Sequence, residues 1–239
     1  MEHFKHSKII SDLNELVKLL KKYEFESSNT MELYRIENMV GQKSKSTGEL
    51  NLVYDFKDIV FNISNSGMKA KPNAKAISVI IDSQYTLQKE ISATDDIFSL
   101  YNFQLYIKGY VDENKNDKFN FFCWHLDREP NTNGHLTHPY YHFHAGGKKM
   151  ADYDPGGLFL ISSPRIPHPP MDVFLAIHFV ILNFLHSEDF STQRKILKDD
   201  SYISIIERAQ KRILDPYFGT FNGIHHSHYS VKNLFPLYV

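Results

Sequence analysis

Two histidines separated by one residue, His142 and His144, are the strongest candidates for chemistry in this sequence. If residues 139–145 form a strand, both imidazoles lie on one face, with α-carbons roughly 7 Å apart, because side chains alternate along a strand. Two imidazoles at this spacing can bind a transition metal such as zinc, iron or nickel. They can also act as general base and general acid, when one is neutral and the other is protonated.

A second candidate is the segment 164–170, which reads Pro-Arg-Ile-Pro-His-Pro-Pro. Its prolines fix φ and favour extended backbone at the residues before them, so His168 is expected to be held rigidly. Arg165 carries a permanent charge and suits a phosphate or carboxylate. If this segment pairs with the strand of His142 and His144, the four side chains converge. One histidine would then accept a proton, another would donate one, and Arg165 would stabilise developing charge during phosphodiester cleavage without a metal.

The same segment has a structural interpretation. It could simply connect a strand to a helix beginning near Asp172, where prolines and an acidic residue are common. In Trp124 to Asp127, alternation places His125 and Asp127 on one face, and Asp127 could orient an imidazole from outside the site. We therefore treat His125, Asp127 and Tyr141 as supporting residues, although an ordinary amphipathic strand explains the 124–127 pattern equally well.

The metal-binding alternative uses His142, His144 and His168 as ligands, so the expected cofactor is either none or a divalent transition metal. His178 lies in an apolar stretch and is expected to be a core histidine. The role of the C-terminal cluster His225-His226-x-His228 stays open.

The composition sets bounds on the function. The chain has 239 residues, 42% of them hydrophobic, and a formal net charge of -1, so no global field favours nucleic acid or a membrane. The single cysteine, Cys123, excludes an intramolecular disulfide, which suits a reducing compartment. The longest apolar run, 173–185, is shorter than the roughly 20 residues of a membrane span. We therefore predict a cytoplasmic protein without a membrane partner.

The hydrophobic periodicity and the turn signals predict a single α+β domain over 1–239: a mostly antiparallel sheet with an N-terminal helix and a C-terminal group of helices packed on one face. The expected helices are 8–24, 171–185, 192–198 and 202–214, and residues 219–239 are expected to be a C-terminal tail. The expected strands are 50–63, 76–82, a hairpin of 103–111 with 119–127, and a pair of 139–145 with 158–165.

Two of these motifs together resemble the TumE-like toxins of bacterial toxin–antitoxin systems. The resemblance covers residues 139–170 and lies in Tyr140-Tyr141-His142 followed by Arg165-Ile166-Pro167-His168-Pro169. It implies a growth-inhibiting toxin that acts on RNA and is neutralised by an antitoxin-like protein partner. His142, Arg165 and His168 would be its active positions.

The leading hypothesis from the sequence is thus a hydrolytic enzyme, a ribonuclease or phosphodiesterase, that acts through the His/Arg cluster. The first alternative is a His-ligated metalloprotein. The second is a non-enzymatic interaction module whose aromatic-rich sheet binds another protein chain.

Overall fold

The computed structural model describes residues 5–25, 52–64, 70, 73–87, 96–112, 119–130, 137–146, 150–152, 165–223 and 229–236. In chain order the elements are α1 (His6–Lys22), β1 (Leu52–Ile63), β2 (Ala76–Leu87), β3 (Phe98–Tyr110), β4 (Phe119–Arg128), β5 (Tyr141–Ala145), β6 (Ile166–Pro167), α3 (Val173–Phe184), the 3₁₀ helix η3 (Gln193–Lys198), α4 (Asp200–Gly219), the 3₁₀ helix η4 (Thr220–Asn222) and α5 (Val231–Leu234).

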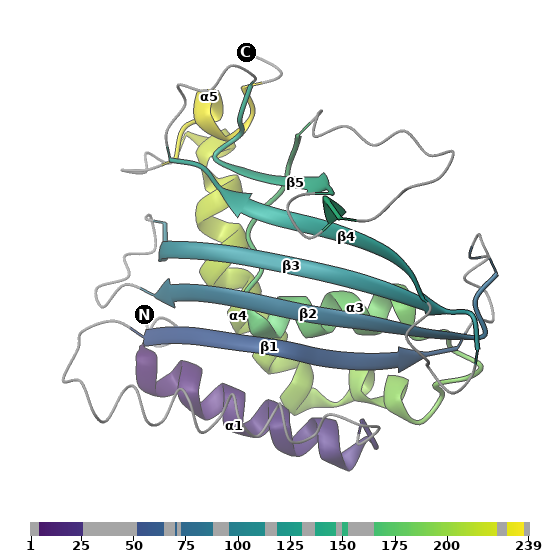
Figure 1. The fold of residues 1–239 in the computed structure, drawn as a ribbon. Helices are drawn as coiled ribbons and strands as arrows, with labels where there is room; N and C mark the ends of the chain where they lie inside the picture. The colour runs from purple at the N-terminus through teal and green to yellow at the C-terminus, as the bar shows by residue number, and fades with distance from the viewer. Residues whose placement is uncertain are drawn as a thin grey trace.

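The strands form one six-stranded antiparallel sheet in the order β1-β2-β3-β4-β5-β6, so each strand pairs with its neighbour in sequence. In Figure 1, α3 and α4 lie behind this sheet and α1 lies beside the β1 edge. The α+β prediction, with helices on one face of a mostly antiparallel sheet, is confirmed. The hairpin prediction is also confirmed, because β3 and β4 pair in register from Asn102↔Asp127 to Tyr110↔Phe119.

The two faces of the sheet differ in composition because side chains alternate along each strand. The face toward the helices carries large apolar residues such as Phe56, Ile81, Phe103 and Leu126, all buried. The opposite face, which we call the open face, carries mostly polar residues toward the β5 side and a small apolar cluster elsewhere. That cluster consists of Ile80, Tyr106 and Cys123, with Met150 packed against it.

The helices pack as their patterns predict. In α1 the stripe of Ile9, Leu13, Leu16 and Leu20 is buried. The first turn of α3 is capped by Asp172, whose side chain accepts a hydrogen bond from the backbone amide of Leu175. That observation supports the connector interpretation of the proline-rich segment.

α4 is longer than predicted and runs from Asp200 to Gly219, across the end predicted at 214. Its first turn is capped by Asp199, whose carboxylate accepts from the amides of Ser201 and Tyr202. Pro216 lies inside the helix. No helix among the described residues is long and apolar enough to cross a membrane.

Part of the predicted tail packs against the sheet. The backbone amide of Tyr140 donates to the carbonyl of Asn233 at 2.7 Å, and Tyr229 and Leu234 are buried. The predicted strand 158–165 lies largely outside the described residues, and the strand observed there is the two-residue β6. It pairs with β5, as predicted for this segment and the His142 strand.

Candidate metal centre on the open face

Four of the predicted residues share the open face at the β4–β5 pair. The register places Asp127 opposite His142 and His125 opposite His144. Directly opposite residues on antiparallel strands project to the same side, with β-carbons about 5 Å apart. The prediction that His142 and His144 share a face is therefore confirmed, and so is the same prediction for His125 and Asp127.

Three of these side chains form a set that could hold a metal ion. Asp127, His142 and His144 each offer one ligand atom, and these atoms all lie within 4.8 Å of one another. Zinc–nitrogen and zinc–oxygen bonds are about 2.0–2.2 Å, which places tetrahedral ligand atoms roughly 3.3 Å apart. Atoms at the outer limit of 4.8 Å would have to approach one another by about 1.5 Å to reach that spacing.

The hydrogen bonds of the two histidines show which ring nitrogen carries the proton in each. Nδ1 of His142 lies 2.9 Å from the carbonyl oxygen of Pro139, and a carbonyl only accepts, so this Nδ1 carries the proton. Nε2 of His144 lies 2.8 Å from Oδ2 of Asp127 and donates to it. Nε2 of His142 thus keeps its lone pair, whereas an ion held by both Asp127 and His144 would replace the hydrogen bond between them and bind Nε2 of His144 after that nitrogen loses its proton. A histidine ligand commonly donates its other N–H to a backbone carbonyl or carboxylate, as His142 does.

The protonation states also suit a metal. Burial lowers the pKa of His142, so this imidazole stays neutral below the pH at which a solvated histidine becomes charged. Burial alone would raise the pKa of Asp127, but the hydrogen bond from His144 and the neighbouring imidazoles outweigh it and lower the pKa overall. A neutral imidazole and an ionised carboxylate are the forms that bind metal.

One atom in the cluster is buried without a hydrogen-bond partner. Nδ1 of His144 makes no hydrogen bond among the described residues. A buried polar atom left unpaired costs free energy, on the order of 1–3 kcal/mol. A ligand that formed a hydrogen bond with this nitrogen would remove that cost.

Arg165 lies beside the cluster. It directly precedes β6, which pairs with β5 at His142↔Pro167, so the continued register places Arg165 opposite His144 on the open face. Its charge contributes to lowering the pKa of His142. Nη1 of Arg165 is also buried without a hydrogen-bond partner in the described part of the chain. An anion is the natural partner for such a group.

His125 flanks the three-residue set. Its ring stacks on that of His144 with centroids 5.3 Å apart and an angle of 19° between the planes. Nε2 of His125 lies 3.4 Å from Sγ of Cys123, which is buried and reduced. His125 therefore supports the position of His144 and stands outside the set of candidate ligands.

The predicted convergence is wrong for His168. Its amide donates to the carbonyl of Tyr141 at 3.2 Å, which aligns it with Tyr141 and turns it to the helix-covered face. Its ring contacts that of Phe143 at 5.4 Å between centroids. Arg165 and His168 are three residues apart in extended backbone, so their side chains project to opposite faces. Asp127 replaces His168 as the third candidate ligand.

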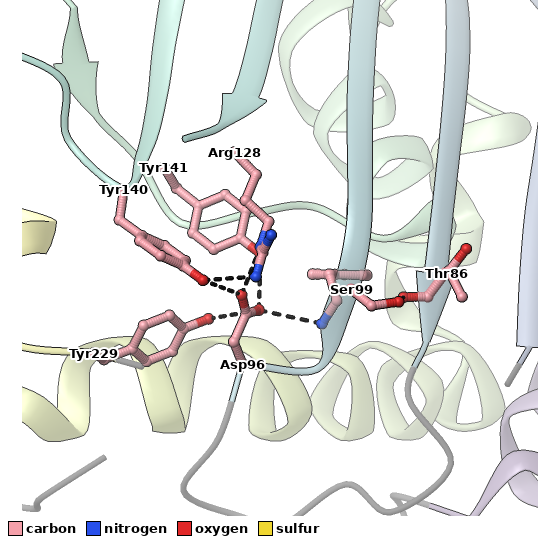
Figure 2. Close-up of polar contacts among 8 residues, drawn as sticks. Thr86, Asp96, Ser99, Arg128, Tyr140, Tyr141 and Tyr229 are labelled. Carbon is pink, nitrogen blue, oxygen red and sulfur yellow. Dashed lines mark hydrogen bonds and ion pairs between the residues drawn. The ribbon is translucent and has the colours of Figure 1, made fainter. Parts of the chain in front are cut away.

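Tyr141 also points away from the cluster, so it does not support the site by contacting the candidate ligands. Its hydroxyl donates at 2.8 Å to Asp96, a buried carboxylate below the end of the sheet. Figure 2 shows the other partners of this carboxylate: the hydroxyls of Tyr140 and Tyr229, at 3.0 and 3.1 Å, and Nε of Arg128, at 2.8 Å. The network anchors the start of β5, and through it His142 and His144.

His138 lies beside the site, with its ring centroid 5.7 Å from that of His142, whereas His178 stands apart from it. Nδ1 of His178 lies 3.0 Å from the hydroxyl of Tyr202 inside the helical layer, consistent with the expected core role. The cluster His225-His226-x-His228 lies outside the described residues. No protein-family model, curated protein or solved structure matches this chain, so the site is interpreted from its own geometry.

Proposed function

We propose that this protein is a metal-dependent hydrolase of phosphoesters, a ribonuclease or phosphodiesterase, whose ion is held by Asp127, His142 and His144. The observation that carries the proposal is the combination of this two-histidine, one-carboxylate set with the unpaired guanidinium nitrogen of Arg165 beside it. Three protein ligands leave coordination positions open for water and substrate, as in catalytic rather than structural metal sites.

The residues divide the chemistry between them. A bound divalent ion would supply a hydroxide at neutral pH and polarise a phosphoryl oxygen. Arg165 would bind the phosphate and offset the negative charge that builds on it in the transition state. The carbonyl of Pro139 keeps the His142 ring oriented, and an ion bound by Asp127 and His144 would take the place of the hydrogen bond between them.

A second candidate is the metal-free mechanism expected from the sequence. The specific observation in its favour is the Asp127–His144 hydrogen bond of 2.8 Å, which resembles a carboxylate that orients a histidine base. With His168 on the other face, His142 would have to act as the general acid. Burial lowers the pKa of His142 and so disfavours the charged form this role requires.

One experiment separates these mechanisms. Hydrolysis of single-stranded RNA and of bis(p-nitrophenyl) phosphate is measured for wild type, His142→Ala, Asp127→Asn and His168→Ala, each with EDTA and after restoration with Zn²⁺, Mn²⁺ or Fe²⁺. The proposal predicts activity that EDTA removes, that one of the metals restores, that both cluster variants lack and that His168→Ala keeps. EDTA-resistant activity supports the metal-free mechanism, and equal activity in all four proteins contradicts both.

The resemblance to TumE-like toxins adds a biological setting to this proposal. In that setting the substrate is RNA and an antitoxin-like protein covers the open face. Induced expression of wild type should then arrest bacterial growth, whereas His142→Ala expressed to the same level should not. Growth arrest by both proteins would separate any toxicity from this site.

A further inference from the structure

The open face carries a hollow next to the candidate metal centre. It has a volume of about 260 Å³ and is formed by β1, β2 and β3. The polar side chains that line it are Asp55, Lys57, Asp82, Gln84, Asn102 and Gln104. It is just below the usual size range of small-molecule pockets, about 300–1,000 Å³, and therefore suits a compact polar group.

The hollow and the metal centre form one continuous surface. Asn102 pairs directly with Asp127, and Gln104 pairs directly with His125, across the β3–β4 ladder. Neighbouring strands are about 4.8 Å apart, so the middle of the hollow lies roughly 10–14 Å from His142 on β5. Figure 1 shows β1 to β5 side by side in this order. One ligand the length of a nucleotide or dinucleotide could occupy both places.

A β-bulge shapes the rim of the hollow. The register shifts between Phe56 and Ile59, so that Lys57 and Asp58 together oppose Asp82. Asp58 has a φ of 56°, and its amide donates to Oδ1 of Asp82 at 2.7 Å. A non-glycine residue in this region is strained, and bulges and strain of this kind are common beside functional sites. The bulge brings Lys57 to the rim and holds the Asp82 carboxylate in place.

The charges of the hollow differ from those at the metal centre. Two carboxylates face a single lysine in the hollow, so a phosphate group is disfavoured there, whereas Arg165 and a cation favour it at the metal centre. The hydroxyl of Tyr106 lies 2.9 Å from Oδ2 of Asp82 and also contacts Oε1 of Gln104, so its single proton is shared between these two acceptors. The hollow thus presents carboxylate acceptors and amide groups to a neutral polar group, and among these amides Nε2 of Gln104 already donates to Oδ1 of Asn102 at 3.4 Å.

We propose that this hollow binds the nucleoside part of a substrate whose phosphate lies at Arg165 and the metal centre. Asparagine and glutamine amides match the donor and acceptor pairs on the edge of a base, adenine in particular. A carboxylate is a common acceptor for ribose hydroxyls. This inference rests on the proposed function for the position of the phosphate, but nucleoside binding in the hollow can be tested without a metal.

The test measures binding of adenosine and of AMP by isothermal titration calorimetry. The proteins are wild type, Gln84→Leu, Asn102→Leu, His142→Ala and the control Asn183→Leu, which replaces an exposed amide on α3. We expect adenosine to bind wild type, His142→Ala and the control equally. We expect at least tenfold weaker binding to Gln84→Leu and Asn102→Leu, whose thermal midpoints should match that of wild type.

The outcomes separate this inference from the proposed function. If adenosine fails to bind wild type at 10 mM, or binds the two hollow variants as well as the control, the inference is wrong, whatever the metal does. Glucose binding as tightly as adenosine would overturn the nucleoside assignment. If adenosine binds as expected but AMP, measured with added Zn²⁺, binds wild type no more tightly than it binds His142→Ala, the hollow assignment stands and the metal-centred hydrolase is contradicted.

Discussion

Two carboxylates at the same end of the sheet, Asp96 and Asp127, differ in their burial and in the hydrogen bonds that they accept. The Asp96 side chain is fully buried on the helix-covered face, and three tyrosine hydroxyls and Arg128 donate to it. The Asp127 side chain is 39% exposed on the open face and accepts from His144.

The difference separates structural stabilisation from function. A buried charge whose hydrogen bonds are all made contributes to a unique fold and offers nothing to a ligand. Around Asp127, by contrast, Nδ1 of His144 and Nη1 of Arg165 are buried and unpaired among the described residues. Such groups are costly to keep unless a ligand uses them. The comparison therefore predicts that substitutions at Asp96 affect folding, and that substitutions at Asp127 affect ligand binding.

The largest expected effect is on stability. Asp96→Ala leaves the Arg128 side chain, which is only 15% exposed, without its counter-ion, and breaking one side of a buried pair costs roughly 3–5 kcal/mol. Urea denaturation should show that loss, or a protein that fails to fold. Asp127→Asn should change the free energy of unfolding by less than about 1 kcal/mol, as expected for a partly exposed carboxylate. Equal losses in the two variants would remove the distinction between the carboxylates.

The next effect is on metal affinity. Loss of an outer partner of a metal ligand alone costs about 10- to 100-fold in affinity, so removing a ligand in His142→Ala should cost at least 100-fold. Competition with a chromophoric chelator measures the change. Tyr141→Phe, which removes only the hydrogen bond to Asp96, is the control, and it should bind metal within a few-fold of wild type while losing stability.

A smaller effect is on the pH dependence of stability. Burial lowers the pKa of His142, His168 and His178 in the folded protein. Below the unfolded pKa of about 6.5, the unfolded chain binds protons that the folded protein does not, so stability is lost as the pH falls. The metal-free protein should have a lower urea midpoint at pH 5.5 than at pH 7.5. A urea midpoint at pH 5.5 that equals or exceeds the midpoint at pH 7.5 would contradict the burial of these histidines.

The smallest effect is expected at His168. His168→Asn removes a ring that packs on Phe143 and leaves the open face unchanged. Metal affinity should stay within about twofold of wild type, while the free energy of unfolding drops by roughly 1 kcal/mol, in the usual range for a partly buried site. A tenfold loss of metal affinity would place His168 back in the site.

Several parts of this description are predictable from local sequence. The polar turn 112–117 between two aromatic-rich runs predicts the β3–β4 hairpin, and alternation predicts the faces of His142, His144, His125 and Asp127. The same alternation applied to Arg165 and His168 would have placed them on opposite faces. The prolines around His168 hold its backbone rigidly, but they do not set the face to which its side chain points.

Other parts depend on long-range pairing and could not be predicted. Asp127 becomes a candidate ligand only because the register aligns it with His142, and a shift of one residue would turn it away. Asp96 collects partners from β4, β5 and the segment of Tyr229, so no local pattern marks it. The hollow depends on the bulge at Lys57 and Asp58. No glycine or proline occurs at these positions, so the sequence carries no signal that predicts the bulge.

The most direct test of the central claim is an anomalous diffraction measurement on crystals of the untagged protein grown with one equivalent of Zn²⁺. We expect a single strong zinc peak within about 2.0–2.3 Å of one ligand atom each from Asp127, His142 and His144. The peak should be absent in crystals of His142→Ala. A wild-type map with no peak among these three residues, or with an equal peak in the variant, would contradict the account.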